Sequence, residues 1–171
     1  MLTKEILILI ALTCLPLFEL RFSIPVAILS GSVNLPLHLT ISGFGWSWPY
    51  AFAFCVFINM ILGPIIFFLL DIFTKFCLHI TFFAKLYNFF VRRTQKRIEK
   101  YIQKYGTLGV ALFIGVPLPG SGSYSGALGA YILGLTPWQF FKANILGVTI
   151  AGILVTFATV TGEGLFRFFF G

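Results

Sequence analysis

The chain has 171 residues, of which 58% are hydrophobic and only 10% are charged, and its mean hydropathy is +0.98. An ordinary soluble domain carries roughly 25% charged residues, so this composition excludes a soluble globular protein and predicts an integral membrane protein. The formal net charge is +7, and all of that excess lies between Lys75 and Lys104. We expect residues 1–171 to form a single membrane domain.

The first predicted element is an apolar arm that breaks near residue 20. Residues 2–20 run into the polar sequence ELRFSIP (residues 19–25), and a second short apolar piece follows at residues 26–41. We expect the chain to turn back inside the membrane at this break, with Ser23 as the helix N-cap and Pro25 in the first turn of the new helix. A full membrane span over residues 2–20 is the alternative.

Glu19 and Arg21 are the sharpest functional candidates in this first break. An ionisable residue inside the membrane costs about 2.5–3.5 kcal/mol on insertion scales, so a break that holds two of them is a functional hypothesis by default. Arg21 would hold an anionic headgroup or phosphate, and Glu19 would carry a proton or a cationic substrate. A mutual salt bridge and simple exposure at the interface are the alternatives.

Residues 50–70 form an uncharged apolar stretch. Crossing ~30 Å of hydrocarbon takes about 20 residues of helix, so this stretch predicts a membrane span. Trp46, Trp48 and Tyr50 stand at its start, where aromatic residues anchor a span at the interface. Asp71 is expected at the other end of the span.

The segment from Lys75 to Lys104 carries eight basic residues and one acid, which predicts by the positive-inside rule that residues 75–104 are cytoplasmic, in a prokaryotic plasma membrane. Apolar residues recur between the basic ones at roughly helical spacing, so residues 79–105 predict an amphipathic helix on anionic lipid headgroups. A nucleic-acid role is the rival. Because no recognition motif accompanies the charge, we expect no nucleic-acid partner.

A second break is predicted at the sequence PLPGSGSY (residues 117–124). Residues 107–116 form an apolar arm that is too short to cross the bilayer alone, and a second arm occupies residues 124–135. We expect this break at membrane depth as well, where irregular backbone is tolerated only beside protein or a water-filled cavity.

The residues of the second break suit an anion site. Pro117 and Pro119 would stop the first arm, and Ser121 or Ser123 would cap the helix that restarts near Tyr124. The N-terminus of that helix attracts anions because it carries partial positive charge and free N–H groups. Helix packing through small residues is the competing interpretation. It is favoured for three glycines further along: Gly126, Gly129 and Gly134.

Residues 143–161 predict a second span, flanked by Trp138 and Lys142, with Glu163 at its far end. The expected fold class is therefore an all-α integral membrane protein with two re-entrant helical hairpins and two transmembrane helices. One span separates the hairpins, so they would enter from opposite faces as an inverted repeat whose breaks meet near the midplane. The predicted parts are repeat 1 (2–72), the cytoplasmic amphipathic helix (79–105) and repeat 2 (106–165).

The predicted substrate or ion site combines the polar and backbone-breaking residues of both breaks. It comprises Glu19, Arg21, Ser23, Pro25, Pro117, Pro119, Gly120, Ser121, Ser123 and Tyr124. A transporter of this plan would work by alternating access around the breaks.

No enzyme is expected. A serine hydrolase would need a base, but His38 and His79 lie far from the serine-rich break in sequence, and no G-x-S-x-G motif occurs. No cluster of histidine, cysteine or carboxylate residues has metal-ligand spacing, so we expect neither a metal nor a cofactor.

Several segments resemble a known family. ELRFSIP (19–25), the region 59–64, the long stretch YGTLGVALFIGVPLPGSGSYSGALGAYILGL (105–135) and LGVTIAGILVT (146–156) are similar to the small multidrug export protein family. More distantly they resemble the DedA superfamily of membrane proteins with paired re-entrant loops. Phe22 stands where the family usually has a small residue after its arginine.

The family resemblance implies export of small molecules, and the distant one implies transport of lipid phosphates coupled to protons or sodium. Those roles would fall on six residues of the two breaks: Glu19, Arg21, Pro117, Pro119, Gly120 and Ser121. The leading hypothesis is thus a secondary transporter or lipid-phosphate translocase, and a non-transporting membrane scaffold or assembly factor is the alternative. Four segments enclose little cavity by themselves, which favours a homodimer.

Overall fold

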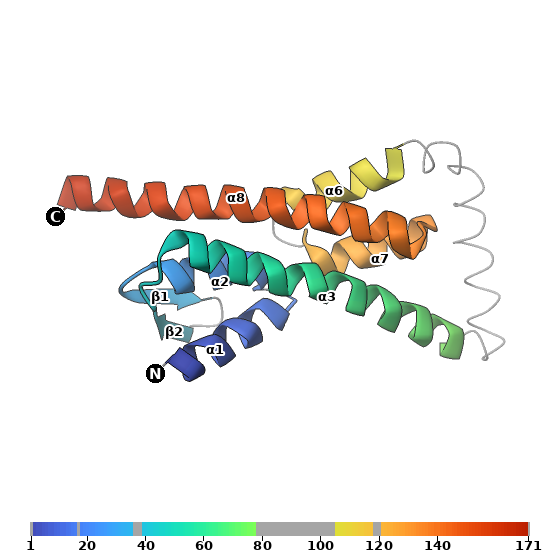
Figure 1. Ribbon diagram of the computed structural model, residues 1–171, viewed down its shortest axis with the longest axis horizontal. Coiled ribbons are helices and arrows are strands. Elements are labelled where there is room, and N and C mark those ends of the chain that lie inside the picture. Colours follow the sequence, from blue (N-terminus) through green and yellow to red (C-terminus); the bar gives the residue numbers. More distant parts are fainter. Residues whose placement is uncertain (1, 17, 36–38, 78–104, 118–120, 171) are drawn as a thin grey trace. The chain divides into compact units, whose positions relative to one another are not determined.

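The computed structural model describes residues 2–16, 18–35, 39–77, 105–117 and 121–170, and helices dominate them (Figure 1). In chain order the elements are α1 (Leu2–Cys14), α2 (Glu19–Ile28), β1 (Ser32–Leu35), β2 (Leu39–Ser42), α3 (Trp48–Cys77), α6 (Thr107–Gly115), α7 (Ser123–Leu133) and α8 (Pro137–Phe170). They divide between two compact units. Unit 1 holds the described residues up to Asn59, Pro117 and those from Thr149 onward, and unit 2 holds the others.

Helices α3 and α8 are long and apolar enough to cross a membrane. The qualifying stretches are Trp48–Thr74 and Pro137–Gly162, which contain the predicted spans at residues 50–70 and 143–161. Both predictions are confirmed at this level.

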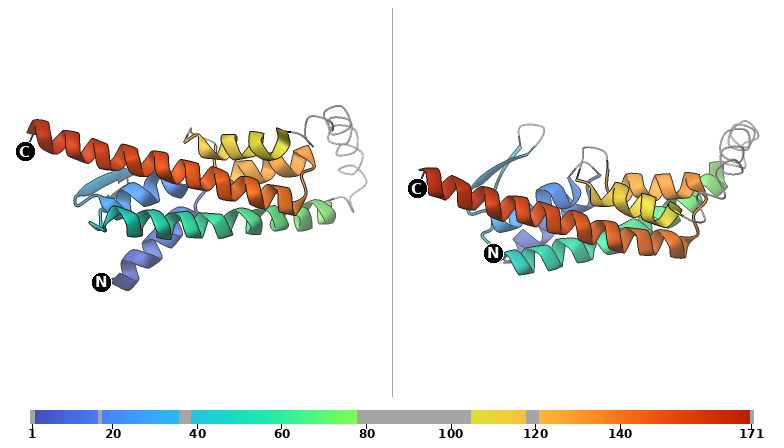
Figure 2. Two further views of the ribbon diagram at one scale, coloured as in Figure 1. Left: turned by 45° about the horizontal axis from the view of Figure 1, so that its top comes forward. Right: turned by 90° about the horizontal axis from the view of Figure 1, so that it is seen from above.

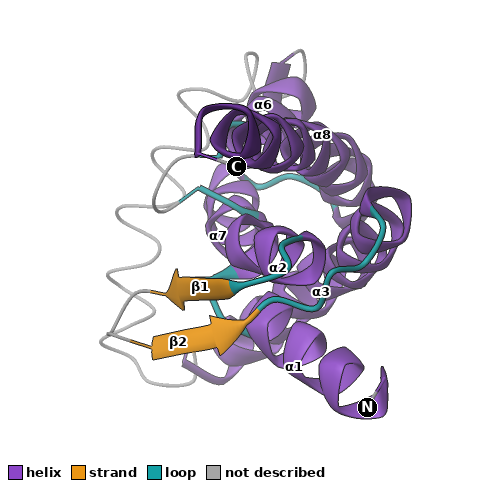
Figure 3. Cartoon of the chain, turned by 90° about the vertical axis from the view of Figure 1, so that its left-hand side faces the viewer, coloured by secondary structure: helices purple, strands orange, loops and turns teal. Residues whose placement is uncertain are grey.

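In unit 1, α1 packs against α2. Leu9 and Ile24 are completely buried in these two helices. Strands β1 and β2 form an antiparallel hairpin in which Ser32 pairs with Ser42, and β1 contacts α2; Figure 3 shows the hairpin in orange.

The loop after β2 completes the C-terminal end of α2. The N–H of Phe44 donates to the carbonyl of Val26 at 2.9 Å, and the N–H of Trp46 donates to the carbonyl of Ala27 at 2.7 Å. The last carbonyls of a helix have no partner inside the helix. These bonds supply the partners for the end of α2.

The first break lies earlier than the sequence pattern predicted. Helix α1 ends at Cys14 and α2 begins at Glu19, so the chain turns around Pro16. A residue that precedes proline disfavours the helical conformation, which favours the end of α1 before Pro16. The predicted second arm at residues 26–41 is helical only to Ile28, because β1 and β2 occupy most of the remainder.

The predicted capping roles of Ser23 and Pro25 are wrong. Both residues lie inside α2, and the hydroxyl of Ser23 donates to the carbonyl of Glu19 at 2.8 Å. Pro25 has no N–H to offer to the carbonyl of Arg21, as in any helix with an internal proline. The residue at the N-cap position is Phe18.

In unit 2, the predicted second break is present. Helices α6 and α7 correspond to the predicted arms at 107–116 and 124–135, and they contact each other. Figure 2 shows them side by side in both of its views. Tyr105 is the one described residue of the predicted amphipathic helix; residues 79–104 of that helix, Pro119 and Gly120 lie outside the described residues.

The cap of α7 also differs from the prediction. Its N-cap residue is Gly122, with φ 151°, a backbone conformation that is accessible to glycine and strained for other residues. Ser121 instead donates its hydroxyl to the carbonyl of Val116, and Ser123 is the first residue of the helix. The predicted serine cap is therefore wrong, because glycine geometry and not a side-chain acceptor forms this turn.

Glycines bring the helices of unit 2 into close contact. A Cβ at Gly147 would lie 2.7 Å from the carbonyl oxygen of Ala111 and 2.6 Å from Cβ of Ile114. Gly126 approaches the same Ile114 side chain from α7, as the packing interpretation predicted. At Gly129 the described residues of other elements leave open space within 4 Å of a Cβ, so its packing role stays a prediction.

The turn between α7 and α8 is closely specified by its sequence. Gly134 ends α7 in the left-handed conformation (φ 77°), and the N–H of Leu135 donates to the carbonyl of Ala130 at 3.0 Å, as in a Schellman motif. Thr136 and Gln139 then form a reciprocal capping box, with Pro137 in the first helical position. Gly134 is thus a helix cap.

Candidate functional site

Glu19 is an unusual residue in unit 1. Its side chain is only 8% exposed, and its φ of 41° is the one positive value of a non-glycine residue in the part of the chain that the structure describes. Such a conformation costs about 1–3 kcal/mol and persists where the surroundings enforce it. The carboxylate lies in the first turn of α2, where the helix dipole stabilises negative charge.

Arg21 and Ser23 follow Glu19 on α2. Arg21 is partly exposed, and its guanidinium interacts electrostatically with the Glu19 carboxylate. Ser23 is completely buried; it bonds to the carbonyl of Glu19 and shares a side-chain hydrogen bond with Cys55 of α3. Pro25 is partly exposed. The structure therefore brings Glu19 and Arg21 together, and it gives Ser23 a packing role between α2 and α3.

Three of the predicted residues of the second break lie at the start of α7 or just before it: Ser121, Ser123 and Tyr124. Ser123 is 1% exposed, whereas Ser121 and Tyr124 are partly exposed and Pro117 is exposed. These serines and Tyr124 belong to unit 2, and Glu19 belongs to unit 1. The meeting of the two breaks near the membrane midplane stays a prediction.

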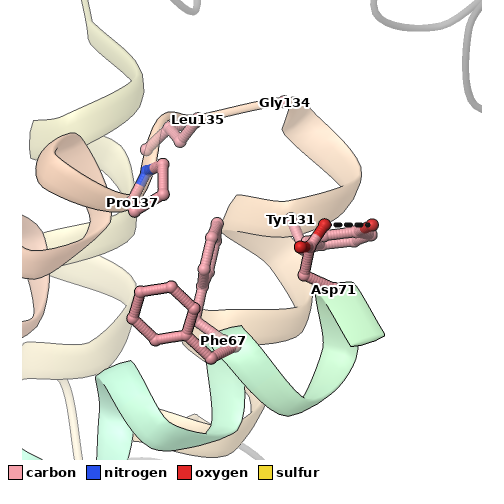
Figure 4. Close-up of a pocket in the computed structure, with 7 residues that line it drawn as sticks. Phe67, Asp71, Tyr131, Gly134, Leu135 and Pro137 are labelled. Atoms are coloured by element: carbon pink, nitrogen blue, oxygen red, sulfur yellow. Dashed lines mark hydrogen bonds between the residues drawn. The ribbon is translucent and has the colours of Figure 1, made fainter. Parts of the chain in front are cut away.

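A pocket in unit 2 contains a carboxylate that the sequence reasoning did not select. It has a volume of about 270 Å³ and is lined by Phe67, Phe68, Asp71, Tyr131, Gly134, Leu135 and Pro137. The hydroxyl of Tyr131 on α7 donates to the carboxylate of Asp71 on α3 at 3.4 Å (Figure 4). Asp71 lies within the apolar stretch Trp48–Thr74.

Aromatic rings support this pocket. Phe67 stacks on Phe140 with ring centroids 4.9 Å apart, and Tyr131 meets Phe67 edge to face at 5.7 Å. Pairs of this kind contribute about 0.5–1.5 kcal/mol beyond the area that they bury. Phe67 and Phe140 are buried, whereas Phe68 is 57% exposed. The pocket therefore has a rigid aromatic floor and an open aromatic wall.

Asp71 and Tyr131 are site residues that the sequence pattern did not predict. Asp71 is an intramembrane carboxylate like Glu19 and thus a functional candidate by the same criterion, although its position predicted the end of a span. Tyr131 and Asp71 are sixty positions apart, so spacing along the chain gave no sign of their contact. The residue that could have indicated this site is Asp71 itself. It lies inside α3, which continues beyond it to Cys77.

Unit 1 contains a second, apolar groove of about 530 Å³ between α3 and α8. Its lining is Trp48, Phe52, Thr149, Ile153, Thr156, Phe157 and Val160. Trp48 and Phe157 are more than half exposed. This groove offers an apolar surface without a charged group in its lining.

A metal centre finds no support among the described residues, which contain no group of three or more histidine, cysteine or carboxylate residues that could hold an ion. The candidate sites are thus a carboxylate–guanidinium pair in unit 1 and a carboxylate–aromatic pocket in unit 2.

Comparison with known families assigns the chain. The profile of the family described as "Putative small multi-drug export protein" matches residues 19–154. The chain belongs to this family. The small multidrug export match begins at the first residue of α2 and contains both candidate sites, and the family and the two apolar helices together make the chain a membrane protein.

Other comparisons add no relative. No curated protein matched the chain, and no solved structure matched it. The more distant similarity to the DedA superfamily stays a prediction.

Proposed function

We propose that this chain is a secondary transporter or lipid-phosphate translocase that moves a small or amphipathic substrate by alternating access. The observation that carries the proposal is the interruption of both helix pairs. Helices α1, α2, α6 and α7 have 13, 10, 9 and 11 residues, whereas a span needs about 20. Each pair accompanies one long apolar helix along the chain, α3 or α8.

Short helices with a break between them suit a transporter for a physical reason. Backbone that is not helical is tolerated at membrane depth only where protein or water satisfies its polar groups. Transporters use such breaks to present helix ends to a substrate, and they commonly arrange them as an inverted repeat. In this proposal the two pairs are re-entrant hairpins that enter from opposite faces.

The proposed surroundings follow from the charge distribution. The chain is multi-pass, in a prokaryotic plasma membrane, with basic residues 75–104 on the cytoplasmic side against anionic headgroups. A homodimer completes the cavity that one chain encloses. Protons or sodium ions drive the cycle, and the substrate leaves chemically unchanged, without an enzymatic step or a cofactor.

The proposed site residues divide by role. Glu19 carries a proton or a cationic group, and Arg21 holds an anionic group. Prolines and glycines of the breaks keep the backbone open to the substrate: Pro25, Pro117, Pro119 and Gly120. Ser121, Ser123 and Tyr124 offer hydroxyl groups at the start of α7.

Flux through reconstituted vesicles tests this function. Wild-type protein is expected to move labelled substrate analogues, namely an aromatic cation and a short-chain lipid phosphate, down an imposed proton or sodium gradient. Glu19→Gln and Arg21→Ala are expected to abolish that flux. Lys4→Gln is the matched control, since Lys4 is an exposed charge on α1. Normal flux in both site variants, with unchanged melting temperature and elution volume, would overturn the assignment of the site.

A membrane scaffold or assembly factor is the second candidate, and the apolar groove of unit 1 favours it. An open groove lined by Trp48, Phe157 and Val160 can hold a transmembrane helix of a partner. A stoichiometric complex with one membrane protein, weakened by Phe157→Ala, together with no flux of either analogue, would support the scaffold over the transporter.

A further inference from the structure

We propose that the pocket of unit 2 binds a lipophilic organic cation, with the carboxylate of Asp71 as its counter-ion and the rings of Phe68 and Tyr131 as its walls. The inference rests on the proposed function in one respect, namely that the bound cation is the exported substrate. Binding itself can be measured without transport.

The chemistry of the lining selects a cation. The pocket combines one carboxylate, one phenol and two phenylalanine rings, and its other members are glycine, leucine and proline. Aromatic faces are electron-rich and attract organic cations. The Asp71 carboxylate adds direct charge attraction, which is strengthened where water is scarce.

The same lining argues against other ligands. A lipid phosphate or another anion would be repelled by the Asp71 carboxylate. A calcium or magnesium ion would need about six oxygen ligands, and the lining side chains offer oxygens only from Asp71 and Tyr131. The volume of about 270 Å³ is at the lower end of pockets that hold small molecules, about 300–1,000 Å³. A quaternary ammonium with one aromatic ring is therefore the class that fits.

The aromatic rings of the pocket differ in how exposed their faces are. Phe67 is 5% exposed and already contacts Phe140 and Tyr131, so it serves as the floor. Phe68 is 57% exposed, and Tyr131 is partly exposed. These two rings can face a guest.

The contact between Tyr131 and Asp71 is compatible with an exchange of partners. Its length of 3.4 Å exceeds the usual 2.7–2.8 Å of hydroxyl hydrogen bonds, so the bond is weak. An arriving cation can therefore compete with the Tyr131 hydroxyl for the Asp71 carboxylate. Deleting the hydroxyl by Tyr131→Phe keeps the ring and removes the competing donor.

The position of the pocket along α3 also suits an amphipathic cation. Asp71 lies near the end of the apolar stretch Trp48–Thr74, and the basic segment begins at Lys75, one helical turn later in the sequence. An aromatic ammonium can place its ring toward the hydrocarbon there and its charge toward the carboxylate.

The test measures binding of radiolabelled benzyltrimethylammonium to the full-length protein in detergent by equilibrium dialysis. Asp71→Asn keeps the size and a hydrogen-bond acceptor but removes the charge, and we expect it to weaken binding about tenfold or more, as for the loss of a charge-assisted contact. Phe68→Leu is expected to weaken binding about two- to fivefold, the size of one cation–π contact. Tyr131→Phe is expected to bind within about threefold of wild type.

Two further measurements make the test specific. Glu5→Gln, which deletes a carboxylate in unit 1, is expected to bind like wild type. Benzenesulfonate, an anion of similar size, is expected not to bind. If Asp71→Asn fails to fold, Asp71→Glu keeps the charge and is expected to retain binding.

Equal binding by wild type and Asp71→Asn would overturn the proposal, and so would binding of benzenesulfonate at comparable strength. Flux of a lipid phosphate in vesicles with no ammonium binding would leave the transporter standing and remove this site. Binding that depends on Asp71 without any flux would keep the site and remove the transporter.

Discussion

The helix pairs α1–α2 and α6–α7 are each two short helices around a break, yet they place polar chemistry differently. In α1–α2 the break forms at Pro16, and the ionisable residues Glu19 and Arg21 follow inside the second helix. In α6–α7 the described part of the break ends at Gly122, and neither helix contains a charged residue. The first pair thus holds its own charges, and the second is neutral.

This difference changes where each unit can meet a charged group. Unit 1 holds a carboxylate that interacts electrostatically with the Arg21 guanidinium. In unit 2 the carboxylate comes from α3, and the neutral pair supplies the Tyr131 hydroxyl. One unit therefore combines opposite charges on one helix, whereas the other joins a carboxylate and aromatic rings from different helices.

The largest expected effect breaks the charge pair of unit 1. Arg21→Met leaves the buried Glu19 carboxylate without the guanidinium, and removal of one partner of a buried pair costs about 3–5 kcal/mol. Because Arg21 is partly exposed, we expect a loss of about 3 kcal/mol, at the lower end of that range. Unfolding in detergent by titration with a denaturing surfactant measures it.

The double variant Glu19→Gln/Arg21→Met is the control for this prediction. It removes both charges, so we expect it to recover most of the lost stability. If Arg21→Met alone unfolds at the same surfactant concentration as wild type, the pair contributes nothing to the fold of unit 1.

The two breaks also differ in how accurately the sequence alone predicted their positions. The arms at 107–116 and 124–135 were located within two residues because proline and glycine mark both sides of that break. The first break was misplaced because the polar residues Glu19, Arg21 and Ser23 are typical of the end of an apolar helix. Polar residues can stay helical when a side chain donates a hydrogen bond back to the helix backbone, as Ser23 does. The residue before Pro16, in contrast, disfavours the helical conformation.

Two features could not be predicted from the sequence, because each depends on contacts between residues that are apart in the chain. The β1–β2 hairpin forms because residues 32–35 pair with residues 39–42. A short apolar run in a sequence is compatible with either a strand or a helix. The pocket at Asp71 depends on a contact with Tyr131 that only the packing of α7 against α3 creates. Local patterns carry no information about such contacts.

A middle-sized effect sharpens the comparison through glycine contacts. In unit 2, a Cβ at Gly147 meets the carbonyl oxygen of Ala111, whereas in unit 1 a Cβ at Gly152 meets the side chains of Val56 and Phe52. Backbone yields less than a side chain, so we expect Gly147→Ala to destabilise the protein by about 2 kcal/mol and Gly152→Ala by about 1, within the usual range for overpacking.

Gly129→Ala is the matched control, because the described residues leave space around that position. Alanine is favoured over glycine inside a helix by about 0.5–1 kcal/mol, so this variant is expected to be slightly more stable than wild type. Thermal unfolding of the three variants in the same detergent gives the order. A loss at Gly147 no larger than that at Gly152 would contradict the close seating of α6 on α8.

The smallest effect compares one left-handed glycine in each unit. Gly134 ends α7 with φ 77°, and Gly45 lies in the loop that closes α2 with φ 66°. Replacing either glycine by alanine costs about 1 kcal/mol, because a Cβ is disfavoured in this conformation. Asparagine tolerates it better, so Gly134→Asn is expected to unfold closer to wild type than Gly134→Ala. At Gly45 a Cβ would also lie 3.1 Å from Oγ of Ser30, so asparagine is expected to recover less of the lost stability there.

If alanine and asparagine are equivalent at both glycines, backbone conformation does not limit either turn. If asparagine is better tolerated than alanine only at Gly134, conformation specifies the left-handed turn that lines the Asp71 pocket, whereas the loop after β2 depends on the space beside Ser30.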